Sequence, residues 1–236
     1  MIFTLMFLVG IAVIAGTWLA RQGLTAKPWL EAAPAAEAPA TDLSSLPAAK
    51  IGLRVFIAVA TGFLVLLISA YTMRMEMADW RPPPQPTLLW GNTGLLIISS
   101  IALHWARTAV HKRDMRAVQD GLVIGGTTAL LFLLGQALAW RELANAGYLL
   151  TSNPADAFFY IITAAHALHV LGGLVALARA GMKLRQGAPL DKLRLSVELC
   201  ATYWHFLLIA WLVLFSLLAF APSISWVYAI CTAPFR

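Results

Sequence analysis

Two apolar runs decide the fold: NPADAFFYIITAAHALHVLGGLVALAR (residues 153–179) and SVELCATYWHFLLIAWLVLFSLLAF (residues 196–220). Each can cross a bilayer as one helix, because about 20 apolar residues span the hydrocarbon. Yet together they carry four ionisable side chains, His166, His169, Glu198 and His205. An ionisable group at bilayer depth costs roughly 2.5 kcal/mol or more unless it is paired. The pattern therefore predicts two transmembrane helices whose polar residues have a partner or a purpose inside the protein.

The composition places the whole chain in a membrane. Hydrophobic residues make up 60% of the 236 residues and charged residues 12%, whereas soluble domains have about 45–50% and about 25%. The net charge of +6 would suit nucleic acid in a soluble protein, but no basic run is interleaved with aromatic residues here. A basic excess in a membrane protein usually marks its cytoplasmic loops. We therefore expect an integral membrane protein and no nucleic-acid partner.

Six apolar segments are continuous enough to span as helices, since unpaired strand edges are not tolerated in lipid: about 2–20, 51–73, 87–109, 121–140, 155–178 and 196–220. Residues 1–20 are predicted to be a retained anchor. A secretory signal carries its positive charge in front of the apolar run, whereas here no Lys or Arg precedes the run and Arg21 follows it. Residues 21–50, rich in Ala and Pro, are predicted to be a cytoplasmic linker. Residues 51–220 form the predicted five-helix bundle, and residues 221–236 a short external tail.

The loop charges predict the orientation of the chain. Most of its 17 Lys and Arg residues fall in the first, third and fifth connections. The positive-inside rule assigns these connections to the cytoplasm, so both termini are expected on the external (periplasmic) side. Cys200 and Cys231 then fall near opposite faces, and no disulfide between them is expected. The predicted fold class is all-α, a polytopic membrane bundle of six transmembrane helices.

The histidines of the last two spans are expected at one depth. With a rise of about 1.5 Å per residue, His166 lies roughly 16 Å from the outer end of its helix and His205 roughly 14 Å from the inner end of the next. His166 and His169 share a helical face, and Glu198 and His205 share another. We therefore expect these two faces to pack together, with interhelical hydrogen bonds between the imidazoles.

Two alternatives stay open for these residues. The histidines could in principle ligate a metal or a haem, but no carboxylate or thiol lies at their level and structural contacts are the commoner use. Glu198 can instead lie close to the inner surface and pair with Arg194 or Lys192.

Other polar or small residues within the spans are interpreted as structural. Gln136 is predicted to be an interhelical hydrogen-bond donor. Gly121 and Gly125 are spaced for close helix packing, although this motif alone is weak evidence. His104 and His111 fall near the inner end of the third span and are expected to be solvated.

A paired motif in the last two spans resembles a known family. The fifth span has aromatic residues and then T-x-x-H-x-x-H-V-x-x-G, at Phe158, Phe159, Tyr160, Thr163, His166, His169, Val170 and Gly173. The sixth has a Glu, then Tyr-Trp-His-Phe and a later Trp, at Glu198, Tyr203, Trp204, His205, Phe206 and Trp211. These residues, with a looser match at Gly135 and Gln136, resemble subunit III of the haem-copper (cytochrome c) oxidases over about 51–220.

The resemblance implies a non-catalytic subunit of a respiratory oxidase in the bacterial inner membrane. Such a subunit packs beside subunit I, which carries haem and copper, in a complex with subunit II and other subunits. It holds structural phospholipids and supports proton uptake and stability while the complex reduces dioxygen in aerobic electron transport. The chain itself is then expected to hold no redox cofactor, no metal and no catalytic residue.

Two positions depart from the family pattern. Many members carry a buried carboxylate in the helix that matches the second span, where this chain has Ala60. An Asp commonly follows the Tyr-Trp-His-Phe motif by two residues, where this chain has Leu208. A proton-related role of the missing acid therefore does not carry over, and the extra N-terminal span lies outside the resemblance.

The sequence allows two other function classes. An accessory subunit of a nitric oxide reductase would share the helix count and some motifs, but the penultimate helix favours the oxidase. An independent transporter or channel would need broken helices or charges that line a path at mid-depth, and the spans here are unbroken. The electron donor, cytochrome c or a quinol, binds to other subunits, so this sequence does not identify it.

Overall fold

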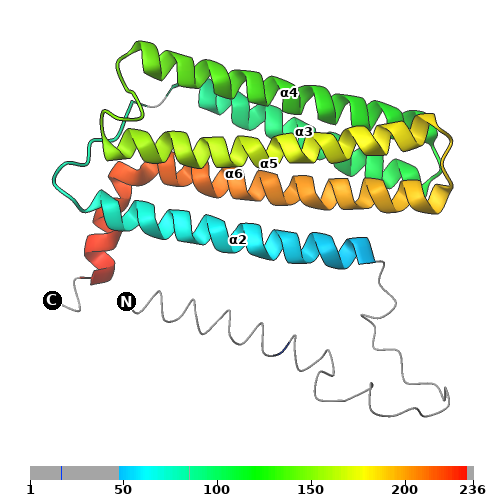
Figure 1. Cartoon of the computed structure of the whole chain (residues 1–236), viewed down its shortest axis with the longest axis horizontal. Coiled ribbons are helices and arrows are strands. Elements are labelled where there is room, and N and C mark those ends of the chain that lie inside the picture. Colours follow the sequence, from blue (N-terminus) through cyan, green and yellow to red (C-terminus); the bar gives the residue numbers. More distant parts are fainter. Residues whose placement is uncertain (1–16, 18–47, 85, 233–236) are drawn as a thin grey trace. The chain divides into compact units, whose positions relative to one another are not determined.

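The computed structural model describes Thr17, residues 48–84 and residues 86–232, with side chains as far as residue 219. Apart from Thr17, these residues belong to one unit, and they form helices and no strand. The helices are α2 (Ala48–Met75), α3 (Leu88–His111), α4 (Met115–Asn145), α5 (Pro154–Arg185) and α6 (Leu190–Thr232) (Figure 1). All five are long and apolar enough to cross a membrane.

The all-α membrane bundle predicted from the sequence is confirmed by these helices. Each of the five overlaps one of the predicted spans. The predicted anchor (1–20), apart from Thr17, and the predicted linker (21–50), apart from its last three residues in α2, lie outside the described residues. The six-span count and the external placement of both termini therefore stay predictions.

The helix that holds the last predicted span continues beyond it. The sequence predicts a span over about 196–220, and this span lies within α6, which runs to Thr232. A proline removes one backbone hydrogen bond and bends a helix without having to end it. Accordingly, α6 contains Pro222 and changes direction in its C-terminal part, drawn in red (Figure 1).

Capping residues fix where the helices begin and end. Asn153 accepts a hydrogen bond from the N–H of Ala155 at the start of α5, and Asp114 caps α4 in the same way. Side-chain oxygens of this kind satisfy the N–H groups that a helix leaves unpaired at its N-terminus. Gly147 and Gly187 follow α4 and α5 with φ of 89° and 64°, a conformation that commonly ends a helix.

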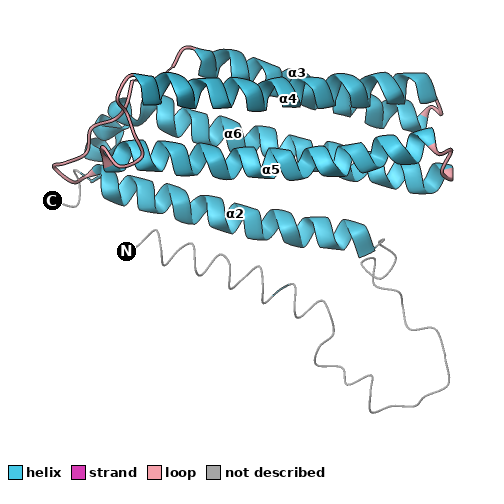
Figure 2. Ribbon diagram, turned by 45° about the horizontal axis from the view of Figure 1, so that its top comes forward, coloured by secondary structure: helices cyan, strands magenta, loops and turns pink. Residues whose placement is uncertain are grey.

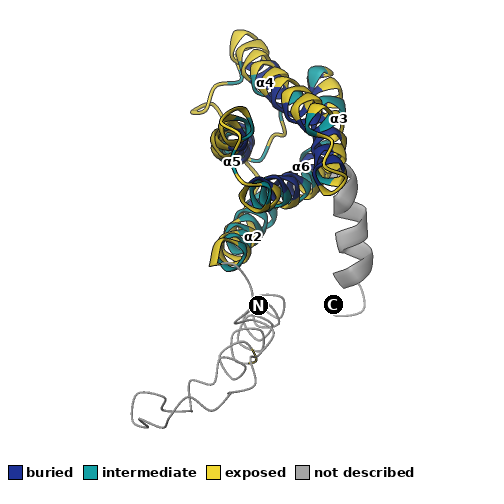
Figure 3. Ribbon diagram, turned by 90° about the vertical axis from the view of Figure 1, so that its right-hand side faces the viewer, coloured by how far each residue is buried: buried dark blue, intermediate teal, exposed yellow. Residues whose placement is uncertain are grey.

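Four of the helices form a closed set, and α2 lies outside it. Within the set, α3 packs on α4 and α6, and α5 also packs on α4 and α6 (Figure 2). Among the described helices, α2 packs on α5 and α6 only. Buried residues line the inward sides of the four-helix set, while α2 consists mostly of partly buried and exposed residues (Figure 3).

α3 and α4 approach each other closely at two glycines. A Cβ on Gly121 would lie 2.8 Å from the carbonyl oxygen of Ala102 and 2.8 Å from the Cβ of Ala106. A Cβ on Gly125 would lie 2.8 Å from the Cγ of Leu103. Lipid supplies no hydrophobic drive between helices, so small residues matter because they let backbones approach for van der Waals packing. The Gly-x-x-x-Gly packing site suggested by the sequence is confirmed.

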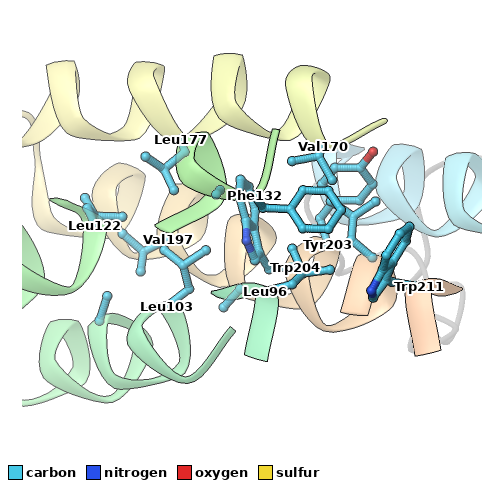
Figure 4. Close-up of a cluster of buried hydrophobic side chains, with 14 of the residues drawn as sticks. Leu96, Leu103, Leu122, Phe132, Val170, Leu177, Val197, Tyr203, Trp204 and Trp211 are labelled. Carbon is cyan, nitrogen blue, oxygen red and sulfur yellow. The ribbon is translucent and has the colours of Figure 1, made fainter. Parts of the chain in front are cut away.

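Large aromatic side chains fill the centre of the bundle. Trp204, Trp211 and Phe132 are fully buried among branched aliphatic residues from α3 to α6 (Figure 4). The rings of Phe132 and Trp211 meet edge to face with their centroids 5.0 Å apart, an arrangement that aromatic pairs prefer. This layer joins α4 to α6.

Candidate functional site

His166, on α5, lies among aromatic rings and not beside another imidazole. The residue is 4% exposed. Its ring centroid is 5.0 Å from that of Trp211 on α6 and 5.7 Å from that of Phe132 on α4. Its Nε2 has no hydrogen-bond partner within the described residues. His166 therefore contacts α6, but it does so through its ring.

His169, one turn further along α5, bonds to its own helix. Its Nδ1 lies 2.7 Å from the carbonyl oxygen of Ala165, and because a carbonyl only accepts, this nitrogen carries the hydrogen. The ring lies 6.0 Å from that of Phe56 on α2. The hydrogen bond between α5 and α6 at this level comes from Tyr203, whose hydroxyl donates to the His169 carbonyl oxygen at 3.0 Å.

His205, on α6, is hydrogen-bonded to α3. Its Nδ1 lies 2.6 Å from Ser100 Oγ, and its Nε2 lies 3.3 Å from His104 Nδ1. The prediction that imidazoles link the last two spans to each other is therefore wrong. His205 does join two helices, but equal depth along α5 and α6 does not decide which face of α6 turns toward α5. His104, expected to be solvated, is exposed and also pairs with His205.

Glu198 connects three helices at the end of the bundle where α6 begins. Its carboxylate contacts Lys50 of α2 at 3.0 Å, His111 of α3 at 3.2 Å and Arg194 of its own helix at 3.2 Å. The predicted pair with Arg194 is confirmed, and the alternative partner Lys192 is not used. His111, expected to be solvated, is bound here. α2 and α3 do not pack on each other, so this carboxylate links two otherwise separate helices.

Trp204 takes part in hydrogen bonds that run through three helices. Its indole N–H donates to Ser99 Oγ on α3 at 2.7 Å, and the Ser99 hydroxyl donates to the carbonyl oxygen of Gly125 on α4 at 2.7 Å. On its other side, a Cβ on Gly173 of α5 would lie 2.8 Å from the indole ring. The glycine of one sequence motif therefore makes room for the tryptophan of the other.

Two more tryptophans bond across helices, and the sequence does not predict these bonds. Trp211 donates from its indole N–H to Thr93 Oγ1 at 3.0 Å, and Trp140 donates to Thr163 Oγ1 at 2.9 Å. The sequence feature that could have indicated these bonds is a hydroxyl residue within an apolar run. That signal indicates a polar contact but does not name the partner helix.

The side chain of Gln136 makes no hydrogen bond within the described residues. It is 1% exposed, and neither of its amide atoms has a partner there, so the predicted donor role is not seen. Ala60 lies on α2 and lines a small, mostly apolar cavity that His166 and His169 also line. The position assigned to the family carboxylate thus faces two histidines of α5, and alanine offers them no polar group.

The imidazoles of α5 and α6 face different neighbours. His166 meets aromatic rings, His169 its own backbone, and His205 a serine and a histidine of α3. In the part of the chain that the structure describes, no group of three or more His, Cys, Asp or Glu residues is placed to hold a metal ion. The arrangement is suited to contacts between helices.

Comparison with known proteins identifies the family of the bundle. The family model for cytochrome c oxidase subunit III matches residues 51–222. The chain belongs to this family. It is 31% identical over 172 residues to cytochrome c oxidase subunit 3 of a Synechocystis species, covering 70% of this chain and 72% of that one. The resemblance derived from the motifs of the last two spans is confirmed.

Two further relatives extend the comparison. Cytochrome c oxidase subunit 3 of Thermostichus vulcanus is 31% identical over 176 residues, which are 71% of this chain and 85% of that one. A probable cytochrome c oxidase subunit 3 of Mycobacterium bovis is 33% identical over 149 residues, 60% of this chain and 71% of that one. With five helices able to span a bilayer, the chain is an integral membrane protein of the oxidase subunit III family.

Proposed function

We propose that this chain is the non-catalytic subunit III of a respiratory haem-copper oxidase in the bacterial inner membrane. In this proposal it packs against subunit I, which carries haem and copper, in a complex with subunit II and other subunits. The observation that carries the proposal is the family match over residues 51–222, which includes most of every described helix.

The use of polar side chains within the bundle supports a structural role. Glu198, Trp204 and His205 each bond to at least one other helix. Groups held in such contacts fix helix positions, because a hydrogen bond or ion pair made inside the membrane has few alternatives. Electron transfer is then assigned to partner subunits, and this chain contributes stability to the complex.

An apolar groove with cations at one end supports phospholipid binding. The groove lies between α2, α5 and α6, and Arg179 and Lys183 line it one helical turn apart. Lys183 also donates to Ser196 Oγ at 2.7 Å. A lipid phosphate near Arg179 would pair with the guanidinium while an acyl chain lies along the apolar wall.

We further propose that the subunit supports proton uptake only indirectly, through the shape and stability of the complex. The reason lies at Ala60, which faces the cavity that His166 and His169 line. Alanine cannot exchange a proton, so no proton transfer is assigned to that position.

Purification of the tagged chain from its native membrane tests the proposal. We expect haem absorbance, copper and oxygen consumption to co-purify with it. Nitric oxide consumption would assign the chain to a reductase complex instead, and a haem-free chain that moves solute would contradict both.

Native mass spectrometry then tests lipid binding: Arg179→Gln should lose bound phospholipid, whereas Arg141→Gln, a matched change at an exposed position of α4, should retain it.

A further inference from the structure

We propose that the polar face around His104 docks a transmembrane segment of the haem-bearing subunit. This face is formed by His104 and Arg107 of α3 and by His205 of α6. We infer that the docking segment presents a hydrogen-bond acceptor, a carboxylate or a carbonyl group, to the His104 imidazole. The inference rests on the proposed function, because it needs a partner subunit in the membrane.

The direction of the hydrogen bonds follows from Ser100. Its side chain is buried, and its hydroxyl has one partner within the described residues, His205 Nδ1 at 2.6 Å. A buried hydroxyl hydrogen needs an acceptor, so Ser100 donates and Nδ1 of His205 accepts. A neutral imidazole that accepts at one nitrogen carries its hydrogen on the other.

The same rule fixes the hydrogen of His104. With its hydrogen on Nε2, His205 donates to His104 Nδ1, 3.3 Å away. His104 therefore accepts at Nδ1 and carries its own hydrogen on Nε2. No hydrogen bond from this nitrogen is made to any described residue, and the His104 side chain is exposed. The chain of bonds thus ends in an N–H donor at the surface of the bundle.

The depth of His104 makes this donor costly in lipid. The residue lies seven positions before the end of α3 at His111, which is roughly 10 Å along the helix axis. Lys and Arg at such positions can extend to the headgroups, but an imidazole is too short. A phospholipid phosphate therefore does not reach His104, whereas a helix of a partner subunit can place an acceptor at that depth. This favours a protein occupant.

The charge on the same face favours an acceptor-rich partner. Arg107 lies one turn beyond His104, and it lines a pocket with Arg54 of α2 and Thr202 of α6. Neither arginine makes an ion pair within the described residues, while Glu198 of the same pocket is already held by Lys50. The pocket thus keeps two guanidinium groups that a carboxylate or a row of carbonyl groups would complement.

The outward face of α4 provides the contrast. Between residues 123 and 138 its exposed large residues are apolar: Val123, Ile124, Leu130, Leu131, Leu134 and Leu138. Such a face suits lipid, because it presents no unsatisfied polar group to the hydrocarbon. It therefore serves as the control surface for tests of docking.

Photo-crosslinking in the intact complex tests the docking surface. A photoreactive residue replaces Ile101 or Thr108, both exposed on α3 near His104, and in the control it replaces Leu131 or Leu138 of α4. We expect crosslinks to the haem-bearing subunit from α3 and at least fivefold fewer from α4. Crosslinks from α3 only to lipid, or only to residues 1–46 of this chain, would overturn the inference, as would equal yields from both helices.

Substitution of His104 tests the donor itself. His104→Leu removes the N–H, whereas His104→Gln keeps an amide N–H at a similar reach; Ile101→Leu is the control. After a detergent wash, the ratio of this chain to haem in the complex is measured. We expect this ratio to be about tenfold lower for His104→Leu than for wild type. For His104→Gln and Ile101→Leu it should stay near the wild-type value. Equal retention of all variants refutes the donor role. If no haem-bearing subunit co-purifies even with the wild-type chain, the proposed function is refuted as well. The two failures are therefore distinguishable.

Discussion

α2 and α3 are both membrane-spanning helices, but they are held in the bundle by different means. α2 is the more apolar of the two, and only Tyr71 of its residues is buried. α3 is the least apolar of the five, and one side of it is buried along its whole length. Lipid tails are as apolar as leucine, so apolar character places a helix in the membrane without packing it against a neighbour. Small, hydroxyl and aromatic residues determine packing.

Within the described residues, the contacts of α2 lie at its two ends and along one side. At one end Lys50 pairs with Glu198, and at the other Tyr71 meets the rings of Trp80 and Phe158 edge to face, at 5.0 Å and 5.8 Å. α3 instead meets α4 through glycines and α6 through buried hydrogen bonds. The difference predicts that equivalent substitutions will cost much more in α3 and α4 than in α2.

The largest effect is expected at the contact between α3 and α4. Gly121→Ala places a Cβ 2.8 Å from the carbonyl oxygen of Ala102, and backbone of a packed helix cannot move away cheaply. We expect a loss of about 2–3 kcal/mol in the free energy of unfolding. Thermal or denaturant unfolding of the purified complex, followed by circular dichroism, measures it.

Gly62→Ala in α2 is the matched control. A Cβ at Gly62 meets nothing within 4 Å, so the free energy of unfolding of this variant should equal or slightly exceed that of wild type. The small gain is expected because alanine favours the helix more than glycine does. Equal losses in both variants would mean that close approach of α3 and α4 does not set the stability of the bundle.

A smaller loss is expected from the buried hydrogen bonds of α3. Ser99→Ala removes the acceptor of the Trp204 indole N–H and the donor to the Gly125 carbonyl oxygen. Unpaired buried polar groups are costly, and we expect about 1–2 kcal/mol. The change is measured by unfolding monitored through tryptophan fluorescence, with Thr61→Ala in α2 as control. Within the described residues, the Thr61 hydroxyl bonds only to the carbonyl oxygen of Ile57 in its own helix, so an equal effect there contradicts the comparison.

Loss of the carboxylate of Glu198 should loosen one end of α2. Glu198→Gln keeps the shape of the side chain but weakens its contacts with Lys50, His111 and Arg194. Ion pairs near a surface contribute little, so we expect about 1 kcal/mol or less. Hydrogen exchange of the amides of residues 48–57 should become faster, while that of residues 60–75 stays unchanged. An unchanged rate at 48–57 would show that Glu198 does not hold α2, and Asp191→Asn controls for the loss of a nearby negative charge.

The sequence was sufficient to predict the helices and the family. It was insufficient to predict which side of each helix faces which neighbour. Hydropathy located the five described spans, since the length needed to cross the hydrocarbon constrains them. It did not show that the helix of the last span continues past Pro222 to Thr232. The depth of His205 was estimated from helix rise, but its partner, Ser100 of α3, depends on rotation about the helix axis. In a span that is apolar on all sides, no amphipathic pattern reports that rotation.

The smallest expected effect concerns the turn that follows α2. Arg74 donates two hydrogen bonds to the Asp79 carboxylate, at 2.7 Å and 2.5 Å. These bonds hold the pKa of the Asp79 carboxyl below its usual value. Because the folded-state pKa is lowered, the pair contributes to the free energy of unfolding at pH values above the unfolded-state pKa. This contribution is lost as the pH falls through the folded-state pKa.

Both groups are exposed, so no measurable change in the free energy of unfolding is expected from Arg74→Gln. The readout is instead the carboxylate signal of labelled Asp79 in an infrared titration, whose midpoint should rise in Arg74→Gln. An unchanged midpoint would mean that the pair does not form in the membrane, and that apolar packing around Tyr71, with Trp80 and Phe158, holds this end of α2 without it.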